Sequence, residues 1–305
     1  MKVSVIVSAF NAEDILPVTL PPLLAQDYPS EDLEIIVVND GSTDATSSVI
    51  AHESWAERCT VIDHEVNRGR SATRNTGLRA AKGELLIFVD CDIEVSSDFI
   101  SGHVRRHMDD KVVGLLSCLR PATPPVEKYH QYLFTGRRGA KLIGGERPLP
   151  YRYFIFTATS IKRAAMDKTG EFKEELSGYG IDLHYAYRLW KSFPNYLLFA
   201  PEIEVLQHAL KPFPEALADF RDYGAGNLPV ILKDYPELGK DLGADFVSGG
   251  VIKKLLGHLL FNSIARSSMR LMNTLLPSPF CNLFLRYRMA DALISGYKTS
   301  LNDSA

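Results

Sequence analysis

Several features that mark common protein classes are missing from this sequence. No apolar run reaches the roughly 18 to 20 residues that a transmembrane helix needs, and the short, strand-like start at residues 1–7 is not typical of a signal peptide. The formal charge of −3 offers no basic excess for binding nucleic acid. The cysteines include no Cys-x-x-Cys pair, which argues against a zinc cage or a disulfide framework; they are Cys59, Cys91, Cys118 and Cys281. We therefore expect a cytoplasmic globular protein.

The composition that is present is that of an ordinary soluble domain. Hydrophobic residues make up 46% of the 305 residues and charged residues 23%, which excludes a disordered or fibrous chain. This length suits one α/β domain with appendages, or two small domains.

The first hundred residues alternate strand and helix patterns. Uninterrupted apolar runs predict buried parallel strands at 3–8, 33–38 and 85–89, and a shorter strand is expected at 59–63. Strands alternating with helices at this pitch indicate a parallel sheet with helices on both faces. Ligands of such sheets bind at the carboxyl ends of the strands.

Helices are expected between these strands. One follows Asn11, a candidate cap, and the prolines at 17, 21 and 22 predict that this helix is broken or begins late. A second passes through Val49 and Ile50, and a third covers residues 71–81.

The remainder of the chain is less periodic at first and then helical. Residues 119–152 resemble a long functional loop with one helix over 126–134. A strand is expected at 153–160, a helix at 182–191, and helices from about 213 to the end.

Two carboxylates, Asp90 and Asp92, stand one residue apart directly after a predicted buried strand. A divalent cation prefers oxygen ligands, and a nucleotide diphosphate needs its charge neutralised. This D-x-D arrangement is therefore a candidate cation site; the alternative is a turn that merely favours aspartate.

Asp40 follows the second predicted strand. Its carboxylate can accept hydrogen bonds from a nucleobase N–H or a ribose hydroxyl. A helix-capping loop is the alternative, and we assign that role to Ser42 or Asp44 instead.

The segment 67–77 places arginine and asparagine at the start of a helix, where a phosphate or a base carbonyl can bind. A solvated basic face explains Arg68 or Arg70 as well. Arg74, one turn inside the helix, is the better candidate ligand.

Together these motifs resemble the nucleotide-sugar-binding half of family 2 glycosyltransferases with the GT-A fold. The match runs over about residues 1–100 and is carried by the segments 8–11 (SAFN), 34–44 (EIIVVNDGSTD), 67–77 and 88–92 (FVDCD). A second match covers 153–208. Residues 153–163 with Gly170-Glu-Phe172 resemble the acceptor-side strand and its Gly-x-Phe loop, and 178–188 resemble the start of the catalytic Gly-Glu-Asp helix.

The resemblance implies a fold and a division into domains. The expected fold class is α/β, with a GT-A type, Rossmann-like, mostly parallel sheet flanked by helices and a C-terminal helical extension. The catalytic domain would cover 1–212, with a nucleotide-sugar-binding half at 1–100 and an acceptor half at 101–212. The helical extension would cover 213–305.

The resemblance also implies which residues bind the donor. The base and ribose would be held by Ser8, Ala9, Phe10, Asn11, Asp40 and Arg74. Asp90, followed by Cys91, would contact the ribose and the sugar. Asp92 would bind Mg²⁺ or Mn²⁺ on the diphosphate.

Two further residues have implied roles. Asp182 would be the general base that takes the proton of the acceptor hydroxyl; a helix N-cap is the alternative. His208 matches a position where relatives supply another metal or diphosphate contact; a strand-end histidine satisfied by a neighbour is the alternative.

The sequence departs from the family pattern at two positions. Asn39 stands where the family usually has another aspartate, which weakens the assignment of the base pocket. Ile181 replaces the glutamate that often precedes the catalytic aspartate, which leaves the sugar specificity open.

The implied activity is inverting, metal-dependent transfer of a sugar from a nucleotide diphosphate. UDP is favoured because Asp40 with Arg74 suits a uracil edge, with GDP and dTDP left open. The acceptor would be a hydroxyl of a glycan or lipid-linked molecule in cell-envelope, polysaccharide or glycoconjugate synthesis.

Other functions fit the sequence less well. A nucleotidyltransferase needs a Gly-rich basic loop after the first strand, and 8–11 is not one. A non-catalytic nucleotide-sugar-binding protein would not need all three of Asp90, Asp92 and Asp182. A dehydrogenase is disfavoured because no G-x-G-x-x-G opens the first helix.

The tail combines an apolar helical face with positive charge. Residues 251–298 contain seven Lys or Arg and one acid, Asp291. The apolar positions recur at helical spacing; they are Val251, Ile252, Leu255, Leu256, Leu259, Leu260 and Ile264. Such a helix either lies on an anionic membrane surface, at the inner face of the membrane, or packs on the catalytic domain.

Overall fold

The computed structural model describes residues 1–52, 58–136 and 138–303, which form two compact units. The first unit comprises Met1–Pro124, Gly136–Glu175 and Asp182–Ala209. The second comprises Pro125–Thr135, Leu176–Ile181 and Leu210–Ala305.

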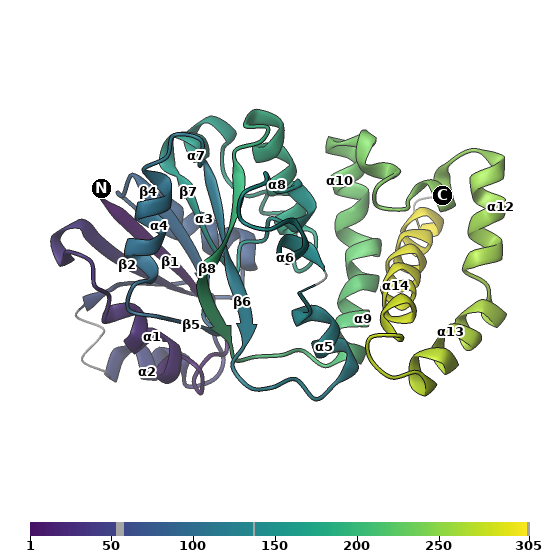
Figure 1. Ribbon diagram of the computed structural model, residues 1–305, viewed down its shortest axis with the longest axis horizontal. Coiled ribbons are helices and arrows are strands. Elements are labelled where there is room, and N and C mark those ends of the chain that lie inside the picture. The colour runs from purple at the N-terminus through teal and green to yellow at the C-terminus, as the bar shows by residue number, and fades with distance from the viewer. Residues whose placement is uncertain (53–57, 137, 304–305) are drawn as a thin grey trace. The chain divides into compact units, whose positions relative to one another are not determined.

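The described part of the first unit is built on one eight-stranded sheet (Figure 1). Its strands are β1 (Val3–Ala9), β2 (Leu33–Asn39), β3 (Thr60–Asp63), β4 (Leu85–Asp90), β5 (Ile93–Val95), β6 (Gly114–Pro121), β7 (Ala158–Lys162) and β8 (Leu197–Gln207). Their spatial order is β3-β2-β1-β4-β7-β6-β8-β5. The first four are mutually parallel, as are β6 and β8, whereas β7 and β5 run antiparallel to their neighbours. The expected α/β fold class, with a mostly parallel sheet, is confirmed.

Local sequence explains the centre of this sheet. The side chains of β1, β2 and β4 are buried almost without interruption, as their continuous apolar runs predict. Each Val, Leu or Ile removed from water there contributes about 1.5 to 3 kcal/mol. The three strands predicted at 3–8, 33–38 and 85–89 are therefore confirmed.

Helices accompany the strands. In the first unit they are α1 (Leu16–Leu24), α2 (Thr46–His52), α3 (Arg70–Ala80), α4 (Phe99–His107), α6 (Gly139–Ile143), α7 (Arg163–Thr169) and α8 (Ile181–Ser192), with the 3₁₀ turns η1 (Ser30–Asp32) and η3 (Tyr151–Tyr153). The helices expected through 49–50, over 71–81 and over 182–191 are confirmed as α2, α3 and α8.

The helix α1 begins late, as its prolines predict. Pro17 lies in its first turn, and Pro21 and Pro22 lie inside the helix without ending it. The expectation that Asn11 caps this helix is wrong, because the helix begins five residues later at Leu16. The Asn11 side chain instead accepts the N–H of Thr43 over 2.9 Å.

The strand expected at 153–160 is wrong over its first half, because β7 begins only at Ala158. The aromatic and β-branched residues at 153–157 suggest a strand, yet the backbone of Phe156 bonds to side chains and not to a neighbouring strand. Its N–H donates to Asp182 and its carbonyl accepts from Arg74.

The segment 119–152 is only partly the predicted loop. The strand β6 extends into it as far as Pro121, and the helix expected at 126–134 is present as α5 (Lys128–Phe134). The short helix α6 also lies in this segment, where only one helix was expected. The strands β5, β6 and β8 and the helices α4, α6 and α7 were not predicted.

The second unit is helical, which confirms the expectation for the chain beyond 213. Besides α5 it contains α9 (Phe213–Asp222), the π-helix η4 (Tyr223–Asn227), α10 (Leu228–Asp234), the 3₁₀ turn η5 (Pro236–Gly239), α11 (Asp245–Ser248), α12 (Val251–Leu260), α13 (Ser263–Leu275) and α14 (Asn282–Asp303). One of its apolar clusters joins α5, α9 and α14 through Tyr129, Tyr132, Phe213 and Leu285, together with Cys281, which directly precedes α14.

Within the described ranges, none of the helices combines the length and the apolar content needed to span a bilayer.

Candidate functional site

Three polar segments emerge at the carboxyl ends of β1, β2 and β4. In the sheet register Ser8 is paired with Val38 on one side and with Asp90 on the other. The segments 8–11, 39–44 and 90–92 therefore leave the sheet at one edge, which is where ligands of parallel sheets bind.

Arg74, on α3, joins two of the predicted site carboxylates. Its Nη1 donates to Asp182 Oδ1 over 2.7 Å, and its Nη2 donates to Asp90 Oδ1 over 3.2 Å. The side chain is only 1% exposed, and its guanidinium lies 5.6 and 5.5 Å from the ring centres of Phe156 and Phe172. Arg74 therefore holds the two acids at a fixed separation from inside the protein, and its contact with a nucleotide base stays a prediction.

Asp182 lies in the first turn of α8. Its Oδ1 accepts from Arg74, and its Oδ2 accepts the N–H of Phe156 over 3.2 Å. Both oxygens thus contact groups outside the helix, so the capping alternative does not describe these contacts. The carboxylate is held in one orientation while remaining partly open to solvent.

The D-x-D segment carries concentrated negative charge. Burial raises the pKa of Asp92, and the neighbouring Asp90 carboxylate raises it further. Burial, followed by the charges of Asp92 and Asp90, raises the pKa of the Cys91 thiol to about 12. Gln207 on β8 donates to Asp92 Oδ2 over 3.1 Å. A cation here would relieve the repulsion between the two acids.

Arg70 is influenced by the charge of the predicted site acids, although the sequence favours Arg74 as the ligand. The pKa of Arg70 is raised, chiefly by the negative charge of Asp90 and further by Asp182 and Asp92. Arg70 and Arg74 are four residues apart on α3 and thus share a face of the helix. The four-residue spacing of the two arginines could have indicated this in the sequence. A helix face that buries Arg74 can place Arg70 one turn away, at the start of the helix, where a ligand can reach it.

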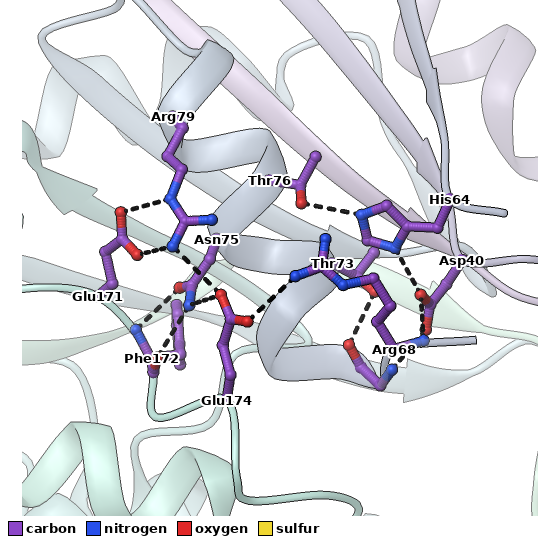
Figure 2. Close-up of polar contacts among 11 residues, drawn as sticks. Asp40, His64, Arg68, Thr73, Asn75, Thr76, Arg79, Glu171, Phe172 and Glu174 are labelled. Atoms are coloured by element: carbon purple, nitrogen blue, oxygen red, sulfur yellow. Dashed lines mark hydrogen bonds and ion pairs between the residues drawn. The ribbon is translucent and has the colours of Figure 1, made fainter. Parts of the chain in front are cut away.

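Asp40 is buried, with 4% of its surface exposed, and closes the loop before α3. It accepts the backbone N–H groups of Arg68 and Gly69, each over 2.9 Å, and contacts His64 Nδ1 at 2.7 Å (Figure 2). The next residue, Gly41, has a φ of 64°, and a Cβ there would lie 2.3 Å from the Val66 carbonyl carbon. Asp40 therefore shapes the loop that presents Arg70, and its predicted role toward base or ribose stays a prediction.

The segment after β1 is tied to the loop after β2. The N–H of Asn11 donates to Ser42 Oγ over 3.0 Å, and Asp44 accepts the N–H groups of Glu13 and Thr46. Asp44 thus serves the start of α2, as expected for one of the two capping candidates. Within the segment 8–11, Ala9 is buried and Phe10 is exposed.

Asn39 and Ile181, the two departures from the family pattern, lie in well-defined surroundings. The Asn39 amide donates to Ser47 and Asp63, each over 2.8 Å, and its oxygen accepts from Ser42. Asn39 thus links β2 to β3 and α2, a role that an aspartate could not fill because it has no N–H to donate. Ile181 is buried.

A second set of contacts holds α3 against the segment 171–174. The Asn75 amide donates to the Phe172 carbonyl over 2.9 Å and accepts the N–H of Phe172 over 2.9 Å. Arg79 pairs with Glu171 and Glu174 at the surface (Figure 2). These contacts fix the Gly-x-Phe loop beside the Arg74 guanidinium.

His208 lies directly after β8, and its N–H donates to the Asp92 carbonyl over 3.0 Å. Its Nε2 lies 2.6 Å from Glu94 Oε2, so a neighbour satisfies that nitrogen as the alternative reading expected. Glu94 and Gln207 were missed by the sequence reading, because nothing local links β5 to β8. The metal role of His208 stays a prediction.

Among the residues described, no group of three or more His, Cys, Asp or Glu side chains could by itself hold a metal ion. A Mg²⁺ or Mn²⁺ ion that binds together with substrate phosphates needs fewer protein ligands than such a group would supply. It is bound through one or two carboxylates together with substrate phosphates and water. The crowded Asp90 and Asp92 pair, with the raised pKa of Asp92, fits that requirement.

Comparison with known proteins agrees with this geometry. Residues 4–170 match the sequence profile described as Glycosyl transferase family 2. Over 100 residues the chain is 38% identical to the poly(ribitol-phosphate) beta-glucosyltransferase of Bacillus spizizenii. This alignment covers 32% of this chain and 16% of that protein. The aligned segments span between 14 and 51% of the length of the first three curated relatives.

Two solved structures share the fold at low sequence identity. The mannosyltransferase PcManGT from Pyrobaculum calidifontis, in complex with GDP-Man and Mn²⁺, aligns over all of this chain and 88% of its own, with a TM-score of 0.64 and 20% identity. S. aureus TarS in complex with UDP-GlcNAc aligns over all of this chain and 91% of its own, with a TM-score of 0.58 and 19% identity.

Proposed function

This chain belongs to glycosyl transferase family 2, and from that membership we propose an inverting transfer of one sugar from a nucleotide-diphosphate sugar to an acceptor hydroxyl. The chain has the GT-A fold of this family; the transfer activity, the donor, the acceptor and the stereochemistry are the parts proposed. The observation that carries the proposal is the pair of acids, Asp90 and Asp182, held by one buried guanidinium beside Asp92.

The proposed reaction requires Asp182 to take the proton of the acceptor hydroxyl. Its oxygens are oriented by Arg74 and by the Phe156 N–H, while the side chain stays partly exposed, so a substrate can reach it. The acceptor oxygen would attack the anomeric carbon opposite the departing diphosphate, which inverts that carbon. Arg70, whose pKa is raised by the charges of Asp90, Asp182 and Asp92, would contact the diphosphate when it is bound.

A divalent cation is expected as the cofactor, with Asp92 as a ligand and Asp90 beside it. When bound, Mg²⁺ or Mn²⁺ stabilises the charge that develops on the leaving diphosphate. The Gln207 amide orients Asp92, because it donates to Oδ2 of this carboxylate.

The nature of the donor is tested by thermal unfolding with nucleotide sugars. We expect a UDP-sugar to raise the melting temperature in the presence of Mg²⁺ or Mn²⁺ and to have little effect with EDTA. A ligand at 100 times its dissociation constant stabilises the folded state by about 2.7 kcal/mol. GDP- and dTDP-sugars at equal concentration compare the bases, and an Asp92→Asn variant should lose the metal-dependent part of the shift. No shift with any nucleotide sugar would contradict the proposal.

The helical unit presents an apolar face to solvent. This apolar face consists of Val251, Ile252, Leu255, Leu256, Leu259, Leu260 and Ile264, whose side chains are between 45 and 78% exposed. Lys254 lies on the opposite side of α12, whereas Lys253 lies at the edge of the apolar face and pairs with Asp245; both lysines are exposed. Ile264 lies on α13 and the other six lie on α12. Large aliphatic side chains that are exposed in such number indicate an interaction surface.

We infer that the apolar face rests on an anionic membrane surface. The segment 251–298 has seven cationic residues and one acidic residue, and each Lys or Arg near such a surface contributes about 1 kcal/mol. A lipid-linked acceptor would be accessible to an enzyme in that position.

Polar substitutions on the apolar face should release the protein from vesicles. An Ile252→Ser, Leu259→Ser double variant is expected to lower partitioning into vesicles with anionic lipid by at least about tenfold, because each exposed aliphatic side chain contributes about 1.5 to 3 kcal/mol when buried. Both positions are exposed, so folding should be unaffected. Met108→Ser, at an exposed apolar site in the first unit, is the control. If the wild-type protein does not sediment with such vesicles, the inference is wrong.

A further inference from the structure

A cavity of about 310 Å³ lies among α9, α13 and α14 of the helical unit. Its lining is rich in arginine; the lining residues are Leu217, Ala218, Arg221, Arg266, Arg270, Tyr287, Arg288, Asp291 and Ala292. Three helices thus direct four guanidinium groups to one cavity, where Asp291 is the single carboxylate of the lining. We call this cavity the arginine pocket.

The carboxylate of the arginine pocket is already engaged. Arg266 Nε lies 2.8 and 3.0 Å from the two oxygens of Asp291, and Arg266 Nη2 donates to Ser295 Oγ over 3.0 Å. This contact satisfies one arginine and leaves the positive charge of the other three without a neighbouring acid from the lining.

The remaining arginines are held close together. Arg288 donates to Asn273 Oδ1 over 3.1 Å and lies 4.7 Å from the ring centre of Phe213. Burial lowers the pKa of Arg288, and the positive charge of Arg270 lowers it further. The side chains of Arg221 and Arg270 form no hydrogen bond or ion pair with another described residue, and both residues are exposed.

The helix α13 is amphipathic, but its charged side faces the pocket and its apolar side is exposed. At 100° per residue, Arg266 and Arg270 share one side of this helix, and Ile264, Leu271 and Leu275 share the other. The arginines line the pocket, whereas the three aliphatic side chains are exposed. A polar interior and an apolar exterior are the arrangement expected where an anion binds inside and an apolar medium covers the outside.

We propose that the arginine pocket binds a phosphomonoester group. A phosphomonoester carries close to two negative charges near neutral pH, which the excess of three cations over acids in the lining can neutralise. A guanidinium group can donate two parallel hydrogen bonds to the oxygens of one phosphate. Several arginines from different helices can therefore surround a single phosphate group. The phosphate can come from a lipid headgroup or from free phosphate, and the inference does not depend on the catalytic site of the first unit.

The full chain should be tested with two probes. In solution, inorganic phosphate is titrated by calorimetry. On membranes, sedimentation compares vesicles of phosphatidylcholine with phosphatidic acid, a monoester, against vesicles of equal surface charge made with phosphatidylglycerol, a diester. The variants are Arg270→Gln and Arg221→Gln, and the matched control is Arg286→Gln, an exposed arginine on α14 outside the pocket lining.

We expect Arg270→Gln to weaken binding by about tenfold or more and Arg286→Gln to leave it within about twofold, since hydrogen bonds to charged groups are the strong ones. Binding of inorganic phosphate that Arg270→Gln weakens identifies a soluble source. A preference for phosphatidic acid that Arg270→Gln abolishes, without binding in solution, identifies a lipid source. The proposal is wrong if neither probe distinguishes the wild-type protein from Arg270→Gln, or if Arg286→Gln has the same effect.

Discussion

Replacing Asp182 by asparagine is expected to lower kcat for sugar transfer by about 10² to 10⁴-fold, the usual contribution of a general base. Asparagine keeps an oxygen for the Arg74 guanidinium but cannot take a proton. The contact with the Phe156 N–H is lost, which costs about 1 kcal/mol of stability. Donor affinity should change little, because the residues expected to bind the nucleotide leave the sheet at the ends of β1, β2 and β4.

The measurement needs initial rates and donor binding on the same preparation. Asp167→Asn, at an exposed aspartate on α7, is the matched control and should retain full activity. A fall in kcat with unchanged donor binding assigns the role to Asp182. Unchanged turnover would remove Asp182 from the mechanism, and a wild-type chain that binds donors without ever transferring sugar would favour a non-catalytic protein.

Substituting Arg74 by glutamine is expected to destabilise the first unit by about 3 to 5 kcal/mol, the cost of removing one partner from a buried ion pair. The Arg74 guanidinium lies 2.7 Å from the Asp182 carboxylate and 3.2 Å from the Asp90 carboxylate. The aromatic rings of Phe156 and Phe172 pack against it. Because Asp90 and Asp182 keep some contact with water, the lower end of the range is expected. Transfer activity should fall as well, since both acids lose their fixed orientation.

Urea unfolding followed by tryptophan fluorescence measures this effect, since Trp190 lies on α8 of the first unit. Arg79→Gln is the control on the same helix. Arg79 also pairs with two glutamates, but it is 53% exposed, so its loss should cost less than about 1 kcal/mol. In an Asp182→Asn background the Arg74 substitution should cost less than in the wild type, because one stranded charge is already gone. Equal effects at Arg74 and Arg79 would show that the buried bridge adds no stability.

Much of the fold could be predicted from local patterns of apolar residues in the sequence. The runs at 3–8, 33–38 and 85–89 are buried strands, and the acids that follow them lie at one edge of the sheet. Continuous apolar runs need burial on both faces, and parallel strands end together, so both results follow from the sequence without knowledge of other contacts. The half-strand at 153–157 failed for the opposite reason, because its backbone serves Arg74 and Asp182, which lie elsewhere in the chain.

The sequence by itself determined the fold class, the family resemblance and the set of acidic residues at the strand ends, because these depend on short-range periodicity and on motif order. Only the tertiary structure decided that Arg74 is a buried bridge between two acids and that the charge of these acids raises the pKa of Arg70. It also decided that Glu94 contacts His208 and that three helices bring arginines to one cavity. Such contacts depend on how distant elements pack and on the direction in which each side chain points. Neither is encoded in the spacing of residues along a single helix or strand.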